Sequence, residues 1–269
     1  MNDLYRELAP ISSAAWAKID AEATRTLKTT LAARKLVDFV GPLGWDVSAV
    51  RLGRTAPLPS APGQGMQARL RKVQPLVELR HAFELSREEL EAIARGAKDP
   101  DLDPVRHAAR EAAYAEDRLV FHGYSDAGIR GLVEAGAGST CSINDDYAAY
   151  PRIVAEATNR LRALGIEGPY GIALGPRCYA GLTTSTVGGF PVIEHVRRLL
   201  DGPIVWAPAV DGAVVLSLRG GDAELVVGQD FSIGYLDHDA TSVRLYLQES
   251  LSFQVLTPEG AVPLAFPAT

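Results

Sequence analysis

Cysteine is scarce in this sequence of 269 residues, which contains only Cys141 and Cys178. The two lie in unrelated contexts, so the chain lacks both the paired spacing of a thiolate metal site and the cysteine density of a disulfide framework. A reducing compartment fits such a sequence best, and we expect the cytoplasm.

Long apolar runs are absent too. No stretch reaches the roughly 18 apolar residues that cross a bilayer. The opening segment MNDLYRELAP is too charged to hold the apolar core of a signal peptide. We therefore expect neither a membrane partner nor export.

Charge of either sign is not concentrated anywhere. The formal net charge is −6, and acidic and basic residues are mixed without a basic tail or block. Such a chain lacks the positive surface that captures nucleic acid, so we expect no nucleic-acid partner. A content of 47% hydrophobic and 22% charged residues is typical of a globular chain with one large domain or two smaller ones.

Motifs of catalysis and metal binding are missing as well. None of the histidines lies in an H-E-x-x-H arrangement or beside a cysteine at ligand spacing; they are His81, His107, His122, His195 and His238. Ser125 in GYSDAG and Ser139 in GAGSTCS do not match G-x-S-x-G after a strand. The segment RGGD, Arg219–Asp222, lacks the lysine of a phosphate loop and reads instead as the turn of a hairpin. We expect no metal site and no enzyme.

The densest group of ionisable residues is the stretch GQDFSIGYLDHD, residues 228–239. It holds Asp230, Asp237, His238 and Asp239. Tips rich in aspartate and histidine are usually solvated turns, so we interpret the stretch as turn and cap residues rather than acids in a mechanism.

Helical periodicity opens the chain. Apolar residues recur at steps of three or four from Ser12 to about Val37, at Trp16, Ile19, Ala23, Leu27 and Leu31. Prolines and glycines then interrupt every pattern from about Gly41 to Lys72, which indicates a protruding arm.

Strands and helices follow in blocks. The segment from Val77 to Leu85 alternates like a half-buried strand. Ser86 and Glu89 form a capping box for a helix that stops near Gly96. Further helices are expected at residues 104–123 and 146–165, and strands at YGIAL, at IVWAP, on both sides of a hairpin at Gly220–Gly221 and over residues 241–256. The fold class is α+β.

Several stretches together resemble the encapsulins, the shell proteins of bacterial and archaeal nanocompartments. They are LYRELAPIS followed by AW and ID, GRTAPL leading to PLVELRHAFELSREEL, AEDRLVFHG, GIEGPY, DGPIVWAPAVDGAVVLSLRGGD, VGQDFSIGY and VRLYLQESLSFQVLTPE. Their order and spacing cover the whole chain, and the terminal pieces look most like actinobacterial members.

The resemblance implies the fold of tailed-phage major capsid proteins. The expected parts are an N-terminal helix with the start of the peripheral domain (1–40), an extended loop (41–72), the peripheral domain (73–134), a mostly axial domain (135–222) and a return to the peripheral domain (223–269). The function it implies is a self-assembling icosahedral shell. Labels carried by some relatives suggest a hydrolase or a secreted bacteriocin instead, but the chain lacks the nucleophile and the export signal that these would need.

Family members bind cargo through a short, partly apolar tail that lies on the N-terminal helix. Transferred to this sequence, the docking residues are Leu27, Leu31, Arg34, Val37, Asp38 and Ile233. Arg34 and Asp38, at i and i+4 of the expected helix, would fix the register of the tail by charge. The expected cargo is a dye-decolorising peroxidase or a ferritin-like iron protein. The alternative is that Leu27 and Leu31 pack into the subunit's own core.

The resemblance also places a pore at the fivefold axis. Its loop comprises Thr183, Thr184, Ser185, Thr186, Val187, Gly188 and Gly189, none of them ionisable. A ring of such loops cannot focus a strong field on passing ions. Glu88 stands where some relatives carry a tryptophan that stacks on flavin, so we expect no flavin and no other cofactor.

Overall fold

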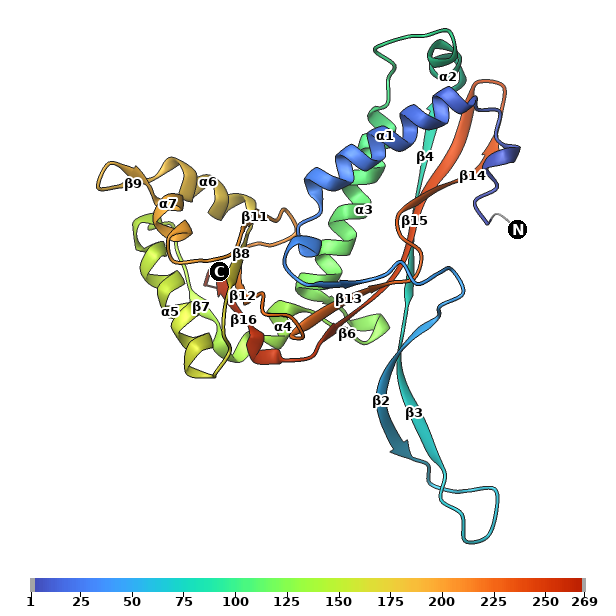
Figure 1. Ribbon diagram of the computed structural model, residues 1–269. Coiled ribbons are helices and arrows are strands. Elements are labelled where there is room, and N and C mark those ends of the chain that lie inside the picture. Colours follow the sequence, from blue (N-terminus) through green and yellow to red (C-terminus); the bar gives the residue numbers. More distant parts are fainter. Residues whose placement is uncertain (1–2, 268–269) are drawn as a thin grey trace.

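Two lobes and a long projecting arm make up the computed structural model, which describes residues 3–267 (Figure 1). The first lobe is built around β15 (Ser242–Val255), which runs antiparallel to β4 (Val77–Ser86), β14 (Ser232–His238) and β13 (Ala223–Val227). The short strand β1 (Asp38–Val40) completes this sheet as the parallel neighbour of β13. The strands expected at residues 77–85 and 241–256 are thereby confirmed.

Three helices cover one face of this sheet: α1 (Ser13–Thr30), α2 (Arg87–Ala94) and α3 (Asp103–His122). The predicted helix at residues 104–123 is confirmed, and Ser86 does cap α2 because its Oγ accepts the amide of Glu88 at 3.2 Å. The capping box is wrong, however. Glu89 instead accepts the amide of Asp101 at 2.9 Å, which fixes the loop after α2.

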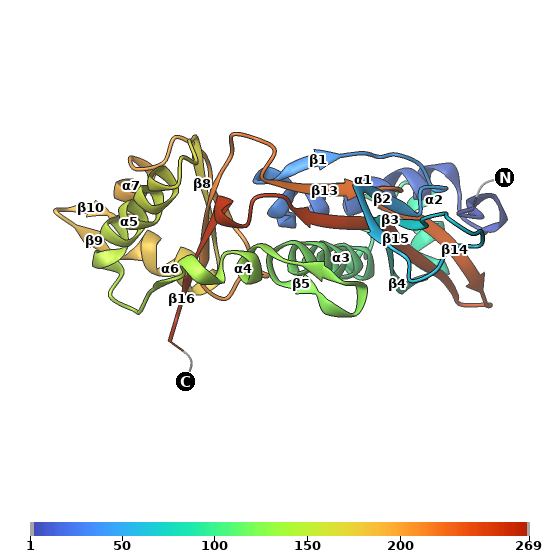
Figure 2. The same cartoon turned by 90° about the horizontal axis from the view of Figure 1, so that it is seen from below.

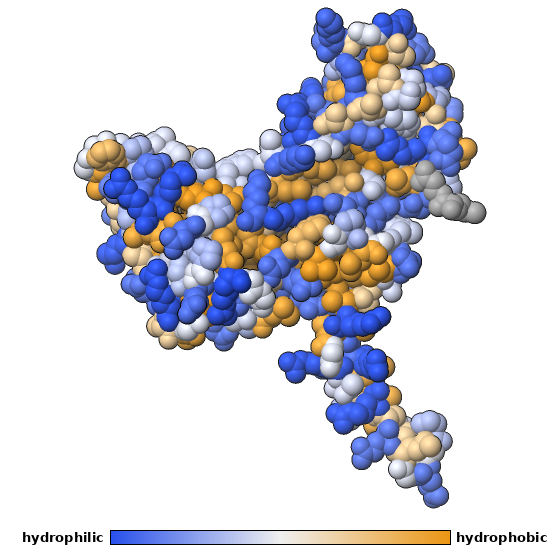
Figure 3. Space-filling view, viewed as in Figure 1, coloured by the Kyte–Doolittle hydropathy of each residue, from blue (hydrophilic) through white to orange (hydrophobic). Residues whose placement is uncertain are grey.

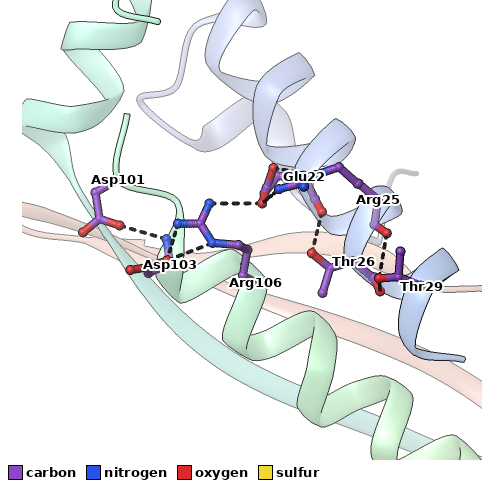
Figure 4. A network of polar contacts seen from close by, with 7 residues as sticks. All are labelled: Glu22, Arg25, Thr26, Thr29, Asp101, Asp103 and Arg106. Carbon is purple, nitrogen blue, oxygen red and sulfur yellow. Dashed lines mark hydrogen bonds and ion pairs between the residues drawn. The ribbon is translucent and has the colours of Figure 1, made fainter. Parts of the chain in front are cut away.

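A polar network joins α1 to the start of α3 (Figure 4). The Arg106 side chain donates to Glu22 of α1 at 3.1 Å and, from its Nε, to Asp103 at 2.8 Å. Arg25 donates to the same Glu22 at 2.6 Å. Because Arg25 is exposed and Arg106 is only partly buried, the network lies at the edge of the helix pair rather than at its centre.

The second lobe holds a five-stranded sheet in the order β11 (Ile204–Trp206), β8 (Tyr170–Leu174), β12 (Ala213–Ser217), β16 (Ala261–Ala265) and β7 (Cys141–Ser142). The longer helices here are α5 (Tyr150–Ala163), α6 (Pro176–Thr184) and α7 (Val192–Arg197). The helix expected from residue 146 begins as a 3-10 turn at Tyr147–Ala149. None of the helices within residues 3–267 combines the length and apolar character of a bilayer span.

Short elements connect these parts. After α3, β5 (Gly123–Tyr124) and β6 (Ile129–Arg130) form a small ribbon, followed by α4 (Leu132–Ala135). The remaining 3-10 turns are Arg6–Leu8, Ala33–Lys35, Ser125–Ala127, Ala137–Ser139 and Pro258–Gly260.

The expected hairpin at Gly220–Gly221 is wrong. β12 and β13, which flank these glycines, lie in different sheets, so the segment crosses from one lobe to the other. The chain crosses back between β15 and β16, beside the crossing at Gly220–Gly221: the amides of Leu256 and Thr257 donate to the backbone oxygen of Asp222. The Asp222 side chain is held in turn by Arg219, at 2.8 and 2.9 Å. Figure 2 shows the two lobes side by side in a flat body.

The arm is a two-stranded ribbon of β2 (Ala49–Pro57) and β3 (Arg69–Pro75), as the glycine- and proline-rich sequence indicated. It extends away from both lobes, with polar and apolar surface mixed along its length (Figure 3). Leu58, Met66, Leu70 and Val73 are 45 to 67% exposed on it. An isolated two-stranded ribbon is marginally stable in water, so this arm needs a partner surface.

Candidate functional site

The structure brings three of the six predicted docking residues together. Leu27, Leu31 and Ile233 belong to one apolar cluster between the helices and the sheet of the first lobe. Only 8, 7 and 4% of their surfaces are exposed, so most of each side chain packs inside the subunit.

The other three predicted residues lie beyond the end of α1. The prediction that one helix runs to about Val37 is wrong, because α1 ends at Thr30 and Asp38 belongs to β1. Arg34 and Asp38 are therefore not one turn apart on a helix. Val37 is half-buried, and Asp38 accepts the amide of Gly221 at 2.6 Å, which fastens β1 to the crossing segment.

Asp117 of α3 explains why α1 stops. Its buried carboxylate accepts the amides of Ala32 and Ala33 at 2.9 and 2.8 Å, so these two amides are withdrawn from the α-helical ladder. The chain turns into the 3-10 segment Ala33–Lys35 at this point. Burial raises the pKa of Asp117 to about 7, although the two amides oppose that rise.

Arg34 is the centre of a buried charge cluster. Its guanidinium donates to Glu116 of α3 at 2.6 Å and to Glu249 of β15 at 2.5 Å, and pairs with Asp230 at 2.9 Å. Both glutamates are fully buried. Burial alone would lower the pKa of Arg34, but these carboxylates outweigh it and hold the pKa above its usual value.

Desolvation raises the pKa of both glutamates. For Glu249, the neighbouring charge of Glu116 adds to this rise, while Arg34 opposes it. Two aromatic rings complete the surroundings of the guanidinium: Phe39 and Phe231 lie 4.9 and 5.0 Å from its central carbon. Phe39 is 37% exposed, so an apolar surface continues from the cluster to the outside of the lobe.

Sequence reasoning missed Glu116, Asp117 and Glu249. Glu249 had a readable signal, since it occupies the same face of β15 as Leu247 and Leu251 and so interrupts an otherwise apolar, inward-facing row. Glu116 and Asp117 gave no comparable signal, because their partners lie about 80 residues away or more.

The ionisable stretch 228–239 is structural. Asp230 accepts the amide of Phe231 at 2.8 Å, and Asp237 pairs with Arg244 across two strands. The amides of Thr241 and Ser242 both donate to Asp239 and lower its pKa to about 2. No group of three or more His, Cys, Asp or Glu side chains within residues 3–267 is arranged to hold a metal ion.

The predicted pore loop lies at the far end of the second lobe. Thr183 and Thr184 end α6, and their hydroxyls donate to backbone oxygens of the same helix at 2.8 and 2.9 Å. Thr186–Val187 (β9) and Phe190–Pro191 (β10) form a hairpin that turns on Gly188 and Gly189. Positive φ angles of 61° and 83° favour glycine at both turn positions.

One ionisable side chain contacts this loop from outside it. Nε2 of His195, on α7, lies 3.0 Å from the backbone oxygen of Val187. The His195 ring also meets the edge of Phe190, with 6.5 Å between ring centres. His195 therefore stabilises the hairpin through its contacts with Val187 and Phe190, although the loop has no ionisable residue of its own.

Comparisons with known proteins agree with the resemblance. A family described as "Encapsulating protein for peroxidase" matches residues 1–252. The type 1 encapsulin shell protein of Rhodospirillum rubrum is 58% identical over 98% of this chain and 96% of its own length. That of Rhodococcus erythropolis is 46% identical over 98% and 100%. The resemblance to actinobacterial members is thus not the strongest among these relatives.

Solved structures share the fold at low identity. The virus-like particle of Pyrococcus furiosus matches with a TM-score of 0.63 and 16% identity, covering 93% of this chain and 99% of that one. The capsid of Myoviridae phage XM1 matches with a TM-score of 0.56 and 13% identity, covering 87% and 90%. The predicted capsid fold is confirmed.

Replacing Asp117 with Asn is expected to change the pH dependence of stability. The folded-state pKa of about 7 lies above the ordinary value of 3.8, so the native chain keeps a proton that the unfolded chain releases. The contribution of Asp117 is thus complete below about pH 4 and is lost as the pH rises to 7, by up to about 1.4 kcal/mol per pH unit. Urea denaturation measures the free energy of unfolding of both proteins. The value for wild type minus the value for Asp117→Asn should fall between pH 4 and pH 8. A difference that stays constant or grows with pH would contradict it.

Proposed function

This chain belongs to the type 1 encapsulin shell protein family, and we propose that its shells enclose a cargo protein that docks beside Arg34. The subunit self-assembles into a shell and has the fold of a phage capsid protein. The structural feature that supports assembly is the arm, because its apolar residues have no partner surface within the described chain. We propose that the shell is icosahedral, with about sixty subunits or a multiple, and that it lies in the cytoplasm.

A neighbouring subunit is the natural partner of the arm. The first lobe supplies the peripheral domain in this proposal and the second lobe the axial domain. Burying exposed leucine and methionine side chains of the arm against a second copy would stabilise the contact by about 25 cal/mol for each Å² of apolar surface. Several such contacts per subunit, repeated by symmetry, hold the shell closed.

The docking site that we propose has a floor and a rim. Leu27, Leu31 and Ile233 form the floor, with the small exposed fractions noted above. Arg34, Val37, Asp38, Phe39 and Phe231 form the rim, where Phe39 offers apolar contact area and Asp38 offers charge. An extended, partly apolar tail fits such a surface because it can place alternate side chains on the rim.

The proposal for the identity of the cargo is based on the description of the family. A family described as encapsulating a peroxidase favours a dye-decolorising peroxidase, with a ferritin-like protein as the alternative. Mass spectrometry of protein that co-purifies with the native shell distinguishes the two.

We further propose that copies of the pore loop, Thr183–Gly189, meet at the fivefold axis. The opening would then be lined by hydroxyl groups, backbone amides and the side chain of Val187. Without formal charge in the ring, passage depends mainly on the size of the solute.

Replacing Leu70 with Asp should prevent the shell from closing. A carboxylate in the buried contact between the arm and a neighbour would be desolvated without a partner. Leu70 is 59% exposed in the single subunit, so the lobes themselves should fold normally. Light scattering and electron microscopy measure assembly, and circular dichroism measures folding. Gln67→Asp adds the same charge at a polar position of the arm and should assemble; closed particles of Leu70→Asp would contradict the role of the arm.

Replacing Phe39 with Asp should leave shells intact but reduce cargo loading at least several-fold. The substitution removes exposed apolar area and sets a charge beside Asp38, where an apolar tail would dock. Loading is measured by co-expression with a protein that carries the cargo tail. Leu164→Asp, at an exposed leucine directly after α5 and outside both proposed sites, is the control that should load normally. Undiminished loading of Phe39→Asp would place the docking site elsewhere, whereas Leu31→Asp would disturb the core and is not informative.

Solute entry into loaded shells should depend weakly on charge and on pH between about 6 and 8. Entry rates of size-matched anionic and cationic substrates test this, with free cargo as the control. A strong preference for one charge would contradict a neutral pore. A pH dependence of solute entry that disappears in His195→Gln would also contradict a neutral pore. It would assign the pH dependence to His195, which contacts the hairpin.

A further inference from the structure

A pocket of about 240 Å³ lies between α3 and the strands β4 and β15, next to the rim of the docking site, with which it shares Phe231. The helix contributes Ala112 and Ala115 to its wall, and side chains this small leave the space open. The strands contribute Leu79 and Leu247, and Phe231 closes one side. These five residues form the apolar part of the wall, and the rest is polar or charged: Arg80, His81, Glu111, Gln248 and Glu249.

Glu249 lines this pocket and is fully buried. Its Oε1 accepts from Arg34 at 2.5 Å, but its Oε2 has no hydrogen-bond partner among the described residues. A buried carboxylate oxygen without a partner costs free energy, and such a group in a native structure points to a missing donor.

The charges around Glu249 also call for a cation. Arg34 alone faces Glu116, Glu249 and Asp230, so one positive charge meets three carboxylates. Glu111 adds another carboxylate to the pocket wall, and His81 lies beside it with its ring edge against His107, 5.9 Å away. The surroundings are therefore short of positive charge.

Arg80 does not supply the missing positive charge, although this residue too borders the pocket. Its guanidinium donates to Gln248 and Glu78 at 2.7 and 3.0 Å and stacks on Tyr246 at 4.2 Å. These partners lie on the other face of the sheet, because Arg80 is opposite Gln248 in the ladder, whereas Glu249 is opposite Leu79.

We propose that this pocket binds a primary alkylammonium group, which donates to Oε2 of Glu249 while its alkyl stem lies among Leu79, Leu247 and Phe231. An ammonium supplies the donor that Oε2 lacks and the charge that the cluster lacks. The apolar wall accommodates several methylene groups. The group belongs either to a free alkylamine or to the side chain of a lysine.

Calorimetric titration of intact, cargo-free shells with n-butylammonium tests the proposal. Saturable binding is expected, and n-butanol, of equal size but neutral, should bind at least ten-fold more weakly. Ammonium chloride at the same ionic strength controls for charge without a stem. Equal binding of butanol and butylammonium, or no saturable binding up to tens of millimolar, would overturn the proposal and leave a pocket filled with water only.

Two variants separate the pocket from general charge effects. Glu249→Gln removes the charge, and Ala112→Leu fills the space while leaving Glu249 in place. Each should weaken butylammonium binding at least ten-fold, and Ala112→Leu keeps the test valid if Glu249→Gln fails to assemble. Wild-type affinity in Ala112→Leu would overturn the proposal. Tighter binding of N-acetyl-lysine amide than of butylammonium would indicate a polypeptide source, and the reverse order a free amine. The shells carry no cargo, so binding is measured without a docked tail, and Ala112→Leu tests the pocket at a residue outside the docking site.

Discussion

The first lobe depends on one guanidinium shared among carboxylates from separate parts of the chain. Arg34 follows the N-terminal helix, Glu116 lies on α3, Glu249 on β15 and Asp230 in the connection before β14. Each glutamate is too deeply buried to be stable without a positive partner, so removing Arg34 would leave uncompensated charge in the core. The cluster therefore holds the helices in register with the sheet more strictly than their apolar surfaces alone would.

Asp117 acts next to this cluster and decides where Arg34 sits. If α1 continued for another turn, the guanidinium would follow the helix and could not occupy its place between Phe39 and Phe231. By accepting the amides of Ala32 and Ala33, Asp117 bends the chain at the one position from which Arg34 reaches all three carboxylates. Placement of the candidate docking surface is thus decided on α3, not on the helix that carries most of its residues.

Sequence patterns predicted the helices and strands that are determined by residues within the same segment. The strand of residues 241–256 and the helix of residues 104–123 follow from periodicity within each segment, and both were predicted almost to the residue. The residue at which α1 ends and the crossing between lobes at Gly220–Gly221 could not be predicted in this way. The first depends on a carboxylate 85 residues away, and the second on which sheet each neighbouring strand joins. The docking residues came from the family resemblance, and the structure clusters the apolar ones, Leu27, Leu31 and Ile233. Packing of Leu27 and Leu31 into the core was the alternative expectation, and how far they are buried depends on α3 and β15.

The paired crossings between the lobes have a mechanical consequence. Both connections pass the same point, where Asp222 is bonded to Arg219 and to the returning chain at Leu256 and Thr257. With the third connection, which runs from α3 through β5, β6 and α4 to β7, these two tied segments resist hinging between the lobes better than a single linker would. Subunits of this kind behave as stiff plates, so the curvature of a closed surface built from them is set at the seams between plates, by the arm and the lobe edges, and not by bending within each plate.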